Sequence, residues 1–224
     1  EIEQENASRI NQEAVAVMAK IAAAGNALLV HYSTDYIFDG TKTNAYIESD
    51  IPNPLSVYGT SKLLGEIAIR DSGCAHLIFR TSWVFSTYGA NFAKTMLRLA
   101  STQEKLRVIC DQWGAPTSAE LIADVTAHVL RNTQEKCHGT YHLAASGETN
   151  WYEYARFVIQ RAIELGAEVK VQAIEPISTS EYPLPATRPA NSRLNCAKLQ
   201  KAFDLSMPHW QYHANRMLVE LTTR

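Results

Sequence analysis

Residues 27–35, Ala-Leu-Leu-Val-His-Tyr-Ser-Thr-Asp, decide the fold of this chain. The first six of them form a continuous apolar run after a short turn, which is typical of a β-strand covered on both faces. A helical pattern at 7–24 precedes this run, and another at 55–71 follows it after a polar, proline-containing loop at 40–54. The order helix, strand, helix predicts a parallel sheet covered by helices.

The same alternation continues along the chain. A second buried strand is predicted at 75–80, followed by a helix at 91–99, a strand at 106–110, a helix at 118–131, a strand at 139–143, a helix at 151–165 and a strand at 169–174. Residues 175–193 read as an ordered, proline-rich loop, and helices at 195–203 and 209–222 finish the chain. We therefore predict the α/β class, with a doubly wound parallel sheet whose ligands bind beyond the carboxyl ends of the strands.

Composition excludes several classes of partner. The 224 residues carry 21 Lys and Arg against 23 Asp and Glu, for a formal net charge of -2, so neither a nucleic acid nor an anionic membrane surface is expected as a partner. The most apolar stretch, 14–32, is interrupted by polar residues and predicts no membrane span. The 4 cysteines lie singly, which favours a reducing, cytoplasmic location.

Tyr58 and Lys62 form a Tyr-x-x-x-Lys pair near the start of the predicted helix at 55–71. At this spacing both side chains project from one helix face, and a cation beside a phenol is expected to lower the phenol's pKa. Tyr58 would then donate a proton near neutral pH, while a hydroxyl of Ser33 or Thr34 holds a substrate oxygen. This trio suits the reduction of a carbonyl group or its reverse.

The other residue patterns in the sequence give weaker predictions of function. Trp83 follows the second buried strand, where an indole can pack on a sugar or nicotinamide face or simply cap the core. His209 and His213 have the spacing of two metal ligands but lack the glutamate of a zinc-peptidase helix, so no metal ligand is predicted. There is no G-x-S-x-G hydrolase elbow and no G-x-G-x-x-G phosphate-binding turn.

Three segments carry a family resemblance: Ser-Thr-Asp-Tyr-Ile-Phe-Asp-Gly at 33–40, Tyr-Gly-Thr-Ser-Lys-Leu at 58–63 and Arg-Thr-Ser-Trp-Val at 80–84. They resemble the extended short-chain dehydrogenases/reductases, and most closely the branch that reduces the C4 keto group of dTDP-4-dehydro-L-rhamnose to dTDP-L-rhamnose for cell-surface polysaccharide. Asp-Gln-Trp-Gly-Ala-Pro-Thr at 111–117 and Arg-Pro-Ala-Asn-Ser-Arg-Leu at 188–194 agree with it. The similarity covers essentially the whole chain.

The resemblance implies a partial Rossmann-type sheet with a smaller C-terminal α/β substrate domain. We expect residues 1–85 and 115–145 to form the partial dinucleotide-binding domain, and residues 86–114 and 146–224 the sugar-nucleotide domain. Family members begin with a strand, a glycine-rich turn and further β-α units that precede the first residue of this sequence. The expectation is therefore a truncated chain, whose activity by itself is in doubt.

The resemblance also assigns roles to single residues. Tyr58 is the proton donor, Lys62 holds the nicotinamide ribose, and Thr34 binds the substrate oxygen. Further expected contacts are Tyr32 to the cofactor, Asp35 and Trp83 to the sugar, Asn91 and Arg188 to the diphosphate, and Asn11 as support for Lys62. The implied cofactor is NADPH or NADH, and the implied assembly is a homodimer, magnesium-linked in the family.

Two other functions stay open at this level. A regulatory protein similar to the beta subunit of methionine adenosyltransferase would keep the fold and act by binding a partner enzyme. A nucleotide-sugar epimerase or dehydratase would retain its oxidised cofactor, but such enzymes usually carry an Asn-x-Tyr-Gly-Pro type segment where this chain has Ser-Trp-Val-Phe at 82–85.

Overall fold

The computed structural model describes residues 3–134, 137–182 and 188–222. The chain divides into a first unit, Glu1–Ser82 with Thr126–Ala144 and Leu184–Ser206, and a second unit, Trp83–Val125 with Ala145–Pro183 and Met207–Arg224. These boundaries differ from the expected ones chiefly at residues 115–125, which lie in the second unit, and at residues 184–206, which lie in the first.

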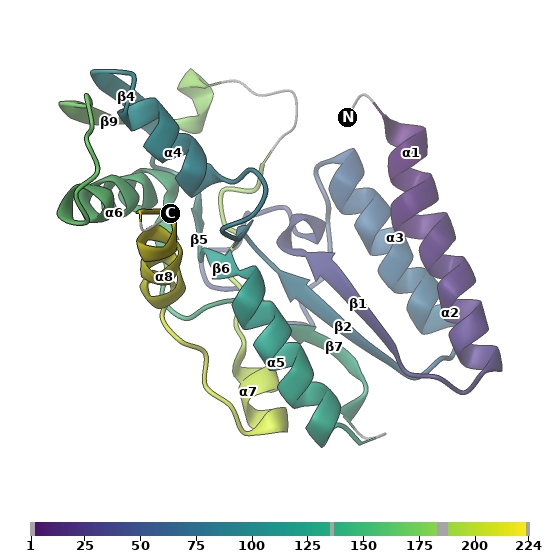
Figure 1. The fold of residues 1–224 in the computed structure, drawn as a ribbon. Coiled ribbons are helices and arrows are strands. Elements are labelled where there is room, and N and C mark those ends of the chain that lie inside the picture. The colour runs from purple at the N-terminus through teal and green to yellow at the C-terminus, as the bar shows by residue number, and fades with distance from the viewer. Residues whose placement is uncertain (1–2, 135–136, 183–187, 223–224) are drawn as a thin grey trace. The chain divides into compact units, whose positions relative to one another are not determined.

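A parallel sheet organises the first unit (Figure 1). Its strands lie in the order β1 (Leu29–Thr34), β2 (His76–Thr81), β7 (Gly139–His142). Thr34 is in register with Thr81, so β1 and β2 end at the same level. The predicted α/β class with a parallel doubly wound sheet is confirmed, and the polar residues at 33–35 lie at a carboxyl edge of the sheet, as a ligand site of this fold requires.

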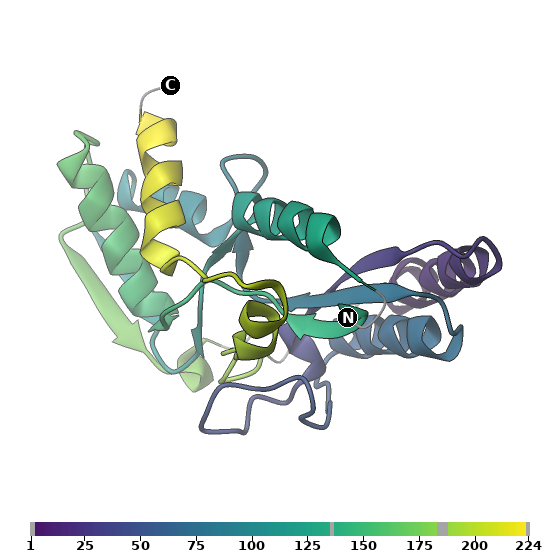
Figure 2. The same ribbon diagram turned by 90° about the horizontal axis from the view of Figure 1, so that it is seen from below.

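Helices cover both faces of this sheet. The first helical segment comprises α1 (Gln4–Ser8), a π-helical turn (Arg9–Glu13) and α2 (Ala14–Ala24), and it packs beside α3 (Val57–Asp71). Apolar side chains from α2, α3, β2 and the link between α3 and β2 form one buried cluster: Val15, Ala19, Ala22, Ile69, Cys74 and Ile78. Figure 2 shows α5 (Ala119–Asn132), of which residues 126–132 belong to this unit, on the side of the sheet opposite α3.

A second buried cluster lies beneath the carboxyl end of β1. A 3-10 turn at Asp35–Ile37 follows that strand, and Ile37, Phe38 and Tyr46 pack together with Leu63 and Leu194. The Phe38 and Tyr46 rings stack at 4.2 Å between centroids. This cluster ties the long loop after β1 to α3 and to the segment that precedes α7 (Ala197–Phe203).

The second unit is built around α4 (Phe92–Ala100), α6 (Trp151–Glu164) and α8 (Trp210–Thr222). Its strand pairs are β4 (Lys105–Ile109) with β9 (Ala173–Ile177), β3 (Val84–Phe85) with β6 (Thr117–Ser118), and β5 (Trp113–Gly114) with β8 (Thr149–Asn150). The last pair is antiparallel and the others are parallel. No helix of the described ranges is long and apolar enough to cross a membrane.

Two predicted elements differ from the structure. The strand expected at 169–174 is found at Ala173–Ile177, because the main-chain N–H groups of Lys170 and Val171 donate to the Ala100 carbonyl group and so hold the preceding residues against the end of α4. The loop expected at 175–193 contains the end of β9 and a 3-10 turn at Thr179–Glu181, and its residues 183–187 lie outside the described part of the chain.

Candidate active site

Tyr58 and Lys62 lie on the first two turns of α3. The Ser56 side chain caps this helix by accepting a hydrogen bond from the Gly59 N–H at 3.1 Å, which fixes the helix start at Val57. Lys62 then follows Tyr58 by one turn, as the spacing predicts.

Gly59 allows α3 to begin directly against the turn that follows β1. A Cβ atom at Gly59 would lie 2.2 Å from the main-chain oxygen of Tyr36, a distance that no real side chain accepts. The close approach places the Tyr58 ring edge-on to the Tyr36 ring, with 5.9 Å between centroids. Glycine at this position is therefore what brings the phenol to the end of β1.

Thr34 is the last residue of β1 and is almost completely buried. Its hydroxyl oxygen accepts from the Tyr36 N–H at 3.2 Å, and its hydroxyl group donates to Asp35 Oδ1 at 3.2 Å. A hydrogen bond of the Thr34 side chain also reaches the Tyr58 phenol and lowers that phenol's pKa. The structure thus brings Thr34, Asp35 and Tyr58 together.

The net pKa of Tyr58 is raised, which differs from the prediction. Burial of the phenol is the largest cause, the Thr34 hydrogen bond opposes it, and negative charge on Asp35 adds to it. The expected lowering by Lys62 is not found, and the Lys62 ammonium group donates to the Tyr32 carbonyl oxygen. At neutral pH Tyr58 is therefore a protonated phenol.

Lys62 has a second neighbour that the sequence analysis did not single out. Its Nζ atom lies 3.4 Å from Nε2 of His31, whose pKa is lowered to about 4 by burial and by the Lys62 charge. His31 is accordingly neutral at physiological pH and can accept a hydrogen bond. An ammonium group carries three donors, so a further N–H remains for a ligand hydroxyl group.

Asp35 is 3% exposed, and burial raises the pKa of its carboxyl group to about 7, against the lowering effect of Ser192 and Thr34. Its Oδ2 atom is buried and makes no hydrogen bond to any residue within the described ranges. A carboxyl group that is half protonated near neutral pH and has an unused oxygen is suited to bind a polar ligand group.

Tyr32, Asn11 and Arg188 complete the predicted residues of the first unit. The Tyr32 hydroxyl group pairs with Thr126 at 2.9 Å, and its side chain is half exposed. Asn11 donates from Nδ2 to Ser61 Oγ at 3.1 Å, so its side chain reaches the neighbour of Lys62 in sequence. Arg188 is exposed. Burial raises the pKa of the Tyr36 phenol, and the positive charge of Arg188 opposes that rise.

Trp83 and Asn91 belong to the second unit. The Trp83 ring stacks on Trp151 with 3.6 Å between centroids and 11° between planes. Asn91 caps α4: its side chain accepts from the Lys94 N–H at 3.0 Å and donates to the Ser86 carbonyl oxygen at 2.6 Å. Its amide group is thus already used within the protein.

Sequence reasoning missed several residues of the first-unit site. Ser192 reaches Asp35 from a segment far along the chain, and nothing in local spacing indicates this. Glu66 lies one turn after Lys62 and is fully buried against Arg80, at 2.7 Å between Oε2 and the Arg80 NH2 group. A glutamate on the sheet-facing side of a helix, opposite an arginine in a buried strand, was the available signal for this pair.

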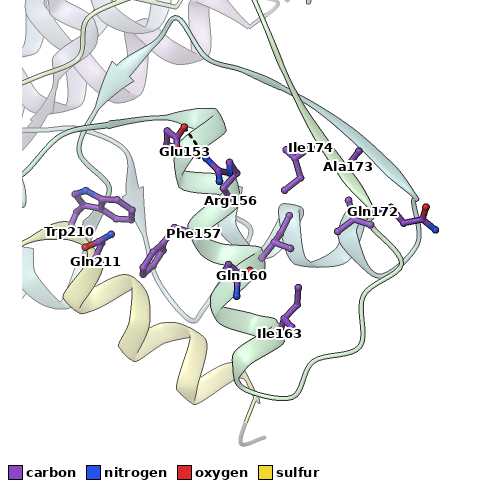
Figure 3. A pocket seen from close by; sticks show the side chains of 12 residues that line it. Glu153, Arg156, Phe157, Gln160, Ile163, Gln172, Ala173, Ile174, Trp210 and Gln211 are labelled. Carbon is purple, nitrogen blue, oxygen red and sulfur yellow. Dashed lines mark hydrogen bonds and ion pairs between the residues drawn. The ribbon is translucent and has the colours of Figure 1, made fainter.

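We also searched the described residues for a metal site and for a cavity that includes the predicted site residues. Within the described ranges, no group of three or more His, Cys, Asp or Glu side chains could hold a metal ion. Figure 3 shows a cavity of about 460 Å³ beside α6, with Glu153, Arg156, Phe157 and Trp210 among its lining residues. It lies within the second unit and includes none of the predicted site residues.

Comparison with known proteins gives consistent matches. The family described as RmlD substrate binding domain matches residues 1–223. The dTDP-4-dehydrorhamnose reductase of Salmonella typhimurium is 49% identical over 225 residues, which cover 100% of this chain and 75% of that protein. Among solved structures, the Bacillus anthracis dTDP-4-dehydrorhamnose reductase in complex with NADP is 33% identical with a TM-score of 0.89, covering 98% of this chain and 75% of that one. The Clostridium acetobutylicum structure of the same name is 32% identical, again with a TM-score of 0.89, over 100% of this chain and 76% of that one.

Proposed function

This chain belongs to the RmlD substrate binding domain family of dTDP-4-dehydrorhamnose reductases, and from that premise we propose that it is an NAD(P)H-dependent oxidoreductase that reduces the C4 keto group of dTDP-4-dehydro-L-rhamnose to dTDP-L-rhamnose. The relatives that match over the whole chain are named as reductases, which favours this function over a regulatory subunit or an epimerase. The observation that carries the proposal is the grouping of Tyr58, Thr34 and Lys62 at the end of β1.

Tyr58 is the proposed proton donor. Its raised pKa keeps the phenol protonated at neutral pH, so a proton is available for the oxygen that becomes the alcohol. Thr34 donates its single hydroxyl hydrogen to Asp35 Oδ1 in this structure. We propose that the hydroxyl group turns this hydrogen to the substrate oxygen when the substrate binds, and so polarises the carbonyl group. Together the two hydroxyl groups orient C4 and stabilise the negative charge that develops on its oxygen.

Lys62 is the proposed contact to the nicotinamide ribose. The donor set fits such a group, because the ammonium uses the Tyr32 carbonyl oxygen and His31 within the protein and keeps an N–H for a ribose hydroxyl group. The half-exposed Tyr32 and Tyr58 side chains offer further surface beside it. A bound nicotinamide cofactor supplies the hydride. The NADP in the Bacillus anthracis relative favours NADPH over NADH for this chain.

The remaining contacts are proposed from the resemblance of the sequence motifs. Asp35, through its unused Oδ2 atom, is proposed to bind a sugar hydroxyl group, and Trp83 to contact the sugar. Arg188 and Asn91 are proposed to bind the diphosphate. Of these two, the exposed Arg188 guanidinium group is the stronger candidate, since the Asn91 amide group caps α4.

We also propose that the protein works as a homodimer in the cytoplasm, the compartment that its singly placed cysteines favour. Mg²⁺ remains an expectation from the family for that dimer. Measuring the mass of the assembly in solution with and without a chelator tests both statements: a monomer in each condition contradicts the dimer, and a dimer that survives the chelator contradicts the role of the metal.

The proposed function is tested by mixing the purified protein with dTDP-4-dehydro-L-rhamnose and NADPH. We expect loss of NADPH absorbance and formation of dTDP-L-rhamnose in equal amounts. An epimerase or dehydratase would change the sugar without net NADPH loss, and a regulatory subunit would leave both compounds unchanged while retaining a methionine adenosyltransferase in a pull-down. Either of the last two results would contradict the proposal.

A further inference from the structure

The Lys62 ammonium group is held by two consecutive residues of β1. Its Nζ atom donates to the Tyr32 carbonyl oxygen at 2.5 Å and lies 3.4 Å from Nε2 of His31. The Tyr32 oxygen belongs to the main chain, so any residue at that position would supply it. The second contact depends on a side chain, and only a residue type with an acceptor at this reach can make it. His31 is therefore the part of the contact that the amino-acid sequence specifies.

The contact with Lys62 determines which ring nitrogen of His31 carries the hydrogen atom. An ammonium group has three N–H donors and no lone pair, so a nitrogen that bonds to it at 3.4 Å must be the acceptor. Burial and the Lys62 charge lower the pKa of His31 to about 4, so the ring is neutral at pH 7. A neutral imidazole has one N–H donor and one acceptor nitrogen. Nε2 therefore carries the lone pair, and Nδ1 carries the hydrogen atom.

The charges around this contact support a charged Lys62 beside a neutral His31. Burial lowers the pKa of both groups, and the negative charge of the fully buried Glu66 opposes both shifts. Among the described residues, Lys62 and Glu66 are the charged groups that act on His31, and both belong to α3. Glu66 thus favours the ammonium form of Lys62, while the ammonium group keeps His31 neutral.

Two acceptors restrict the Lys62 side chain more than one acceptor does. Lysine has a flexible four-carbon stem, so a single bond to the Tyr32 oxygen leaves Nζ free to move around that oxygen. A second acceptor at His31 fixes the position of Nζ, and the tetrahedral ammonium group then has one direction left for its third N–H. A donor that is fixed before the ligand arrives costs less entropy when it binds.

We infer that His31 is a positioning residue for Lys62: its Nε2 atom, together with the Tyr32 carbonyl oxygen, fixes the ammonium group so that the third N–H is held ready for a hydroxyl group of the nicotinamide ribose. The inference rests on the proposed function for the identity of that ligand. It adds to the Tyr-x-x-x-Lys spacing, because the strand and not the helix supplies both acceptors. A contact of 3.4 Å is long for a hydrogen bond, so the expected effect on affinity is severalfold.

The first test determines the tautomer of His31 and needs no cofactor. Nitrogen NMR of the protein with isotope-labelled histidine distinguishes a bare ring nitrogen from one that carries hydrogen, and the His31 signals are those that the His31→Gln variant lacks. At pH 7 we expect hydrogen on Nδ1 and a bare Nε2. Hydrogen on Nε2 overturns the inference, because that nitrogen could not accept from Lys62, and a charged His31 ring overturns it for the same reason.

The second test measures the Kd for NADPH by fluorescence titration. His31→Phe keeps a ring and removes the acceptor, whereas His31→Gln can place an amide oxygen near the position of Nε2. We expect the Kd to rise about fivefold in His31→Phe, the effect of one lost hydrogen bond, and to stay within about twofold of the natural value in His31→Gln. The matched control is His76→Phe, at the amino end of β2, where the histidine pairs with the Cys74 carbonyl oxygen, and it should leave the Kd unchanged.

The outcomes separate the role of His31 from the proposed function. Equal Kd values for the natural protein and His31→Phe overturn the inference. Equal rises in His31→Phe and His31→Gln overturn it too, because the loss of packing and not of the acceptor would then be the cause. A natural protein that binds no NADPH overturns the proposed function instead.

Discussion

Replacing Asp35 by Asn should stabilise the protein in a pH-dependent way. Burial raises the pKa of Asp35 from 3.8 to about 7, so ionising this carboxyl group costs more in the folded than in the unfolded chain. Below the unfolded pKa both states are protonated and no cost arises. Between the two pKa values only the unfolded chain ionises, and the natural protein loses stability as the pH rises.

The size of the effect follows from the same pKa values. A rise from 3.8 to about 7 corresponds to a loss of up to about 4 kcal/mol, complete above about pH 7. Asparagine has nearly the same shape, keeps an oxygen that can accept from Thr34, and cannot ionise. The Asp35→Asn variant should therefore equal the natural protein near pH 4 and exceed it in free energy of unfolding near pH 8.

Urea unfolding at a series of pH values measures this difference. Asp39→Asn is the matched control, because hydrogen bonds from Thr41 and Asn53 lower the pKa of Asp39, and its loss should destabilise the protein above about pH 4. Equal stability of the Asp35→Asn variant and the natural protein at every pH would refute the reasoning. A variant that is less stable near pH 8 would refute it as well.

Three further predictions test the elements that hold the site. Arg80→Met leaves the fully buried Glu66 carboxylate with only the partly exposed Arg70 guanidinium group, 3.1 Å from Oε2, as its ion-pair partner, and should lower the free energy of unfolding by about 3 kcal/mol in urea titrations. Arg156→Met removes an exposed ion pair and should cost less than about 1 kcal/mol, so equal losses would contradict the burial argument. Gly59→Ala places a Cβ atom 2.2 Å from the main-chain oxygen of Tyr36 and should lower the free energy of unfolding by about 1–3 kcal/mol. It should also lower kcat, because α3 can no longer begin directly against the turn after β1. A variant with the natural kcat would show that this close approach is not needed. Lys62→Met removes the ammonium donor and should raise the Kd for NADPH about tenfold in a fluorescence titration, and an unchanged Kd would remove Lys62 from the cofactor site.

The sequence predicts the parts of this fold that depend on local pattern. The apolar run at 27–32 and the helix signals around it predict β1 and α3. A buried strand and a helix with a period of 3.6 residues each require a characteristic spacing of apolar residues, which can be read from neighbouring positions in the sequence. The Tyr-x-x-x-Lys spacing likewise predicts that Tyr58 and Lys62 share one face of a helix.

The parts that depend on distant contacts could not be predicted. The approach of Ser192 to Asp35 and the raised pKa of that carboxyl group depend on where the chain returns after the second unit. The direction of the Tyr58 pKa shift was expected to be set by Lys62, but in the structure burial of the phenol is its largest cause, and the Lys62 ammonium group donates to the Tyr32 carbonyl oxygen. The spacing of residues in the sequence shows which side chains share a helix face, and it does not show which acceptor from another part of the chain binds a given donor.

The turnover rate of the Tyr58→Phe variant tests the central claim most directly. Phenylalanine keeps the ring beside Tyr36 and removes only the hydroxyl group that is bonded to Thr34. With dTDP-4-dehydro-L-rhamnose and NADPH, the proton-donor role predicts a fall in kcat of about 10²–10⁴-fold, with the affinity for NADPH nearly unchanged. A variant that keeps most of its kcat would contradict the assignment of Tyr58 as the acid.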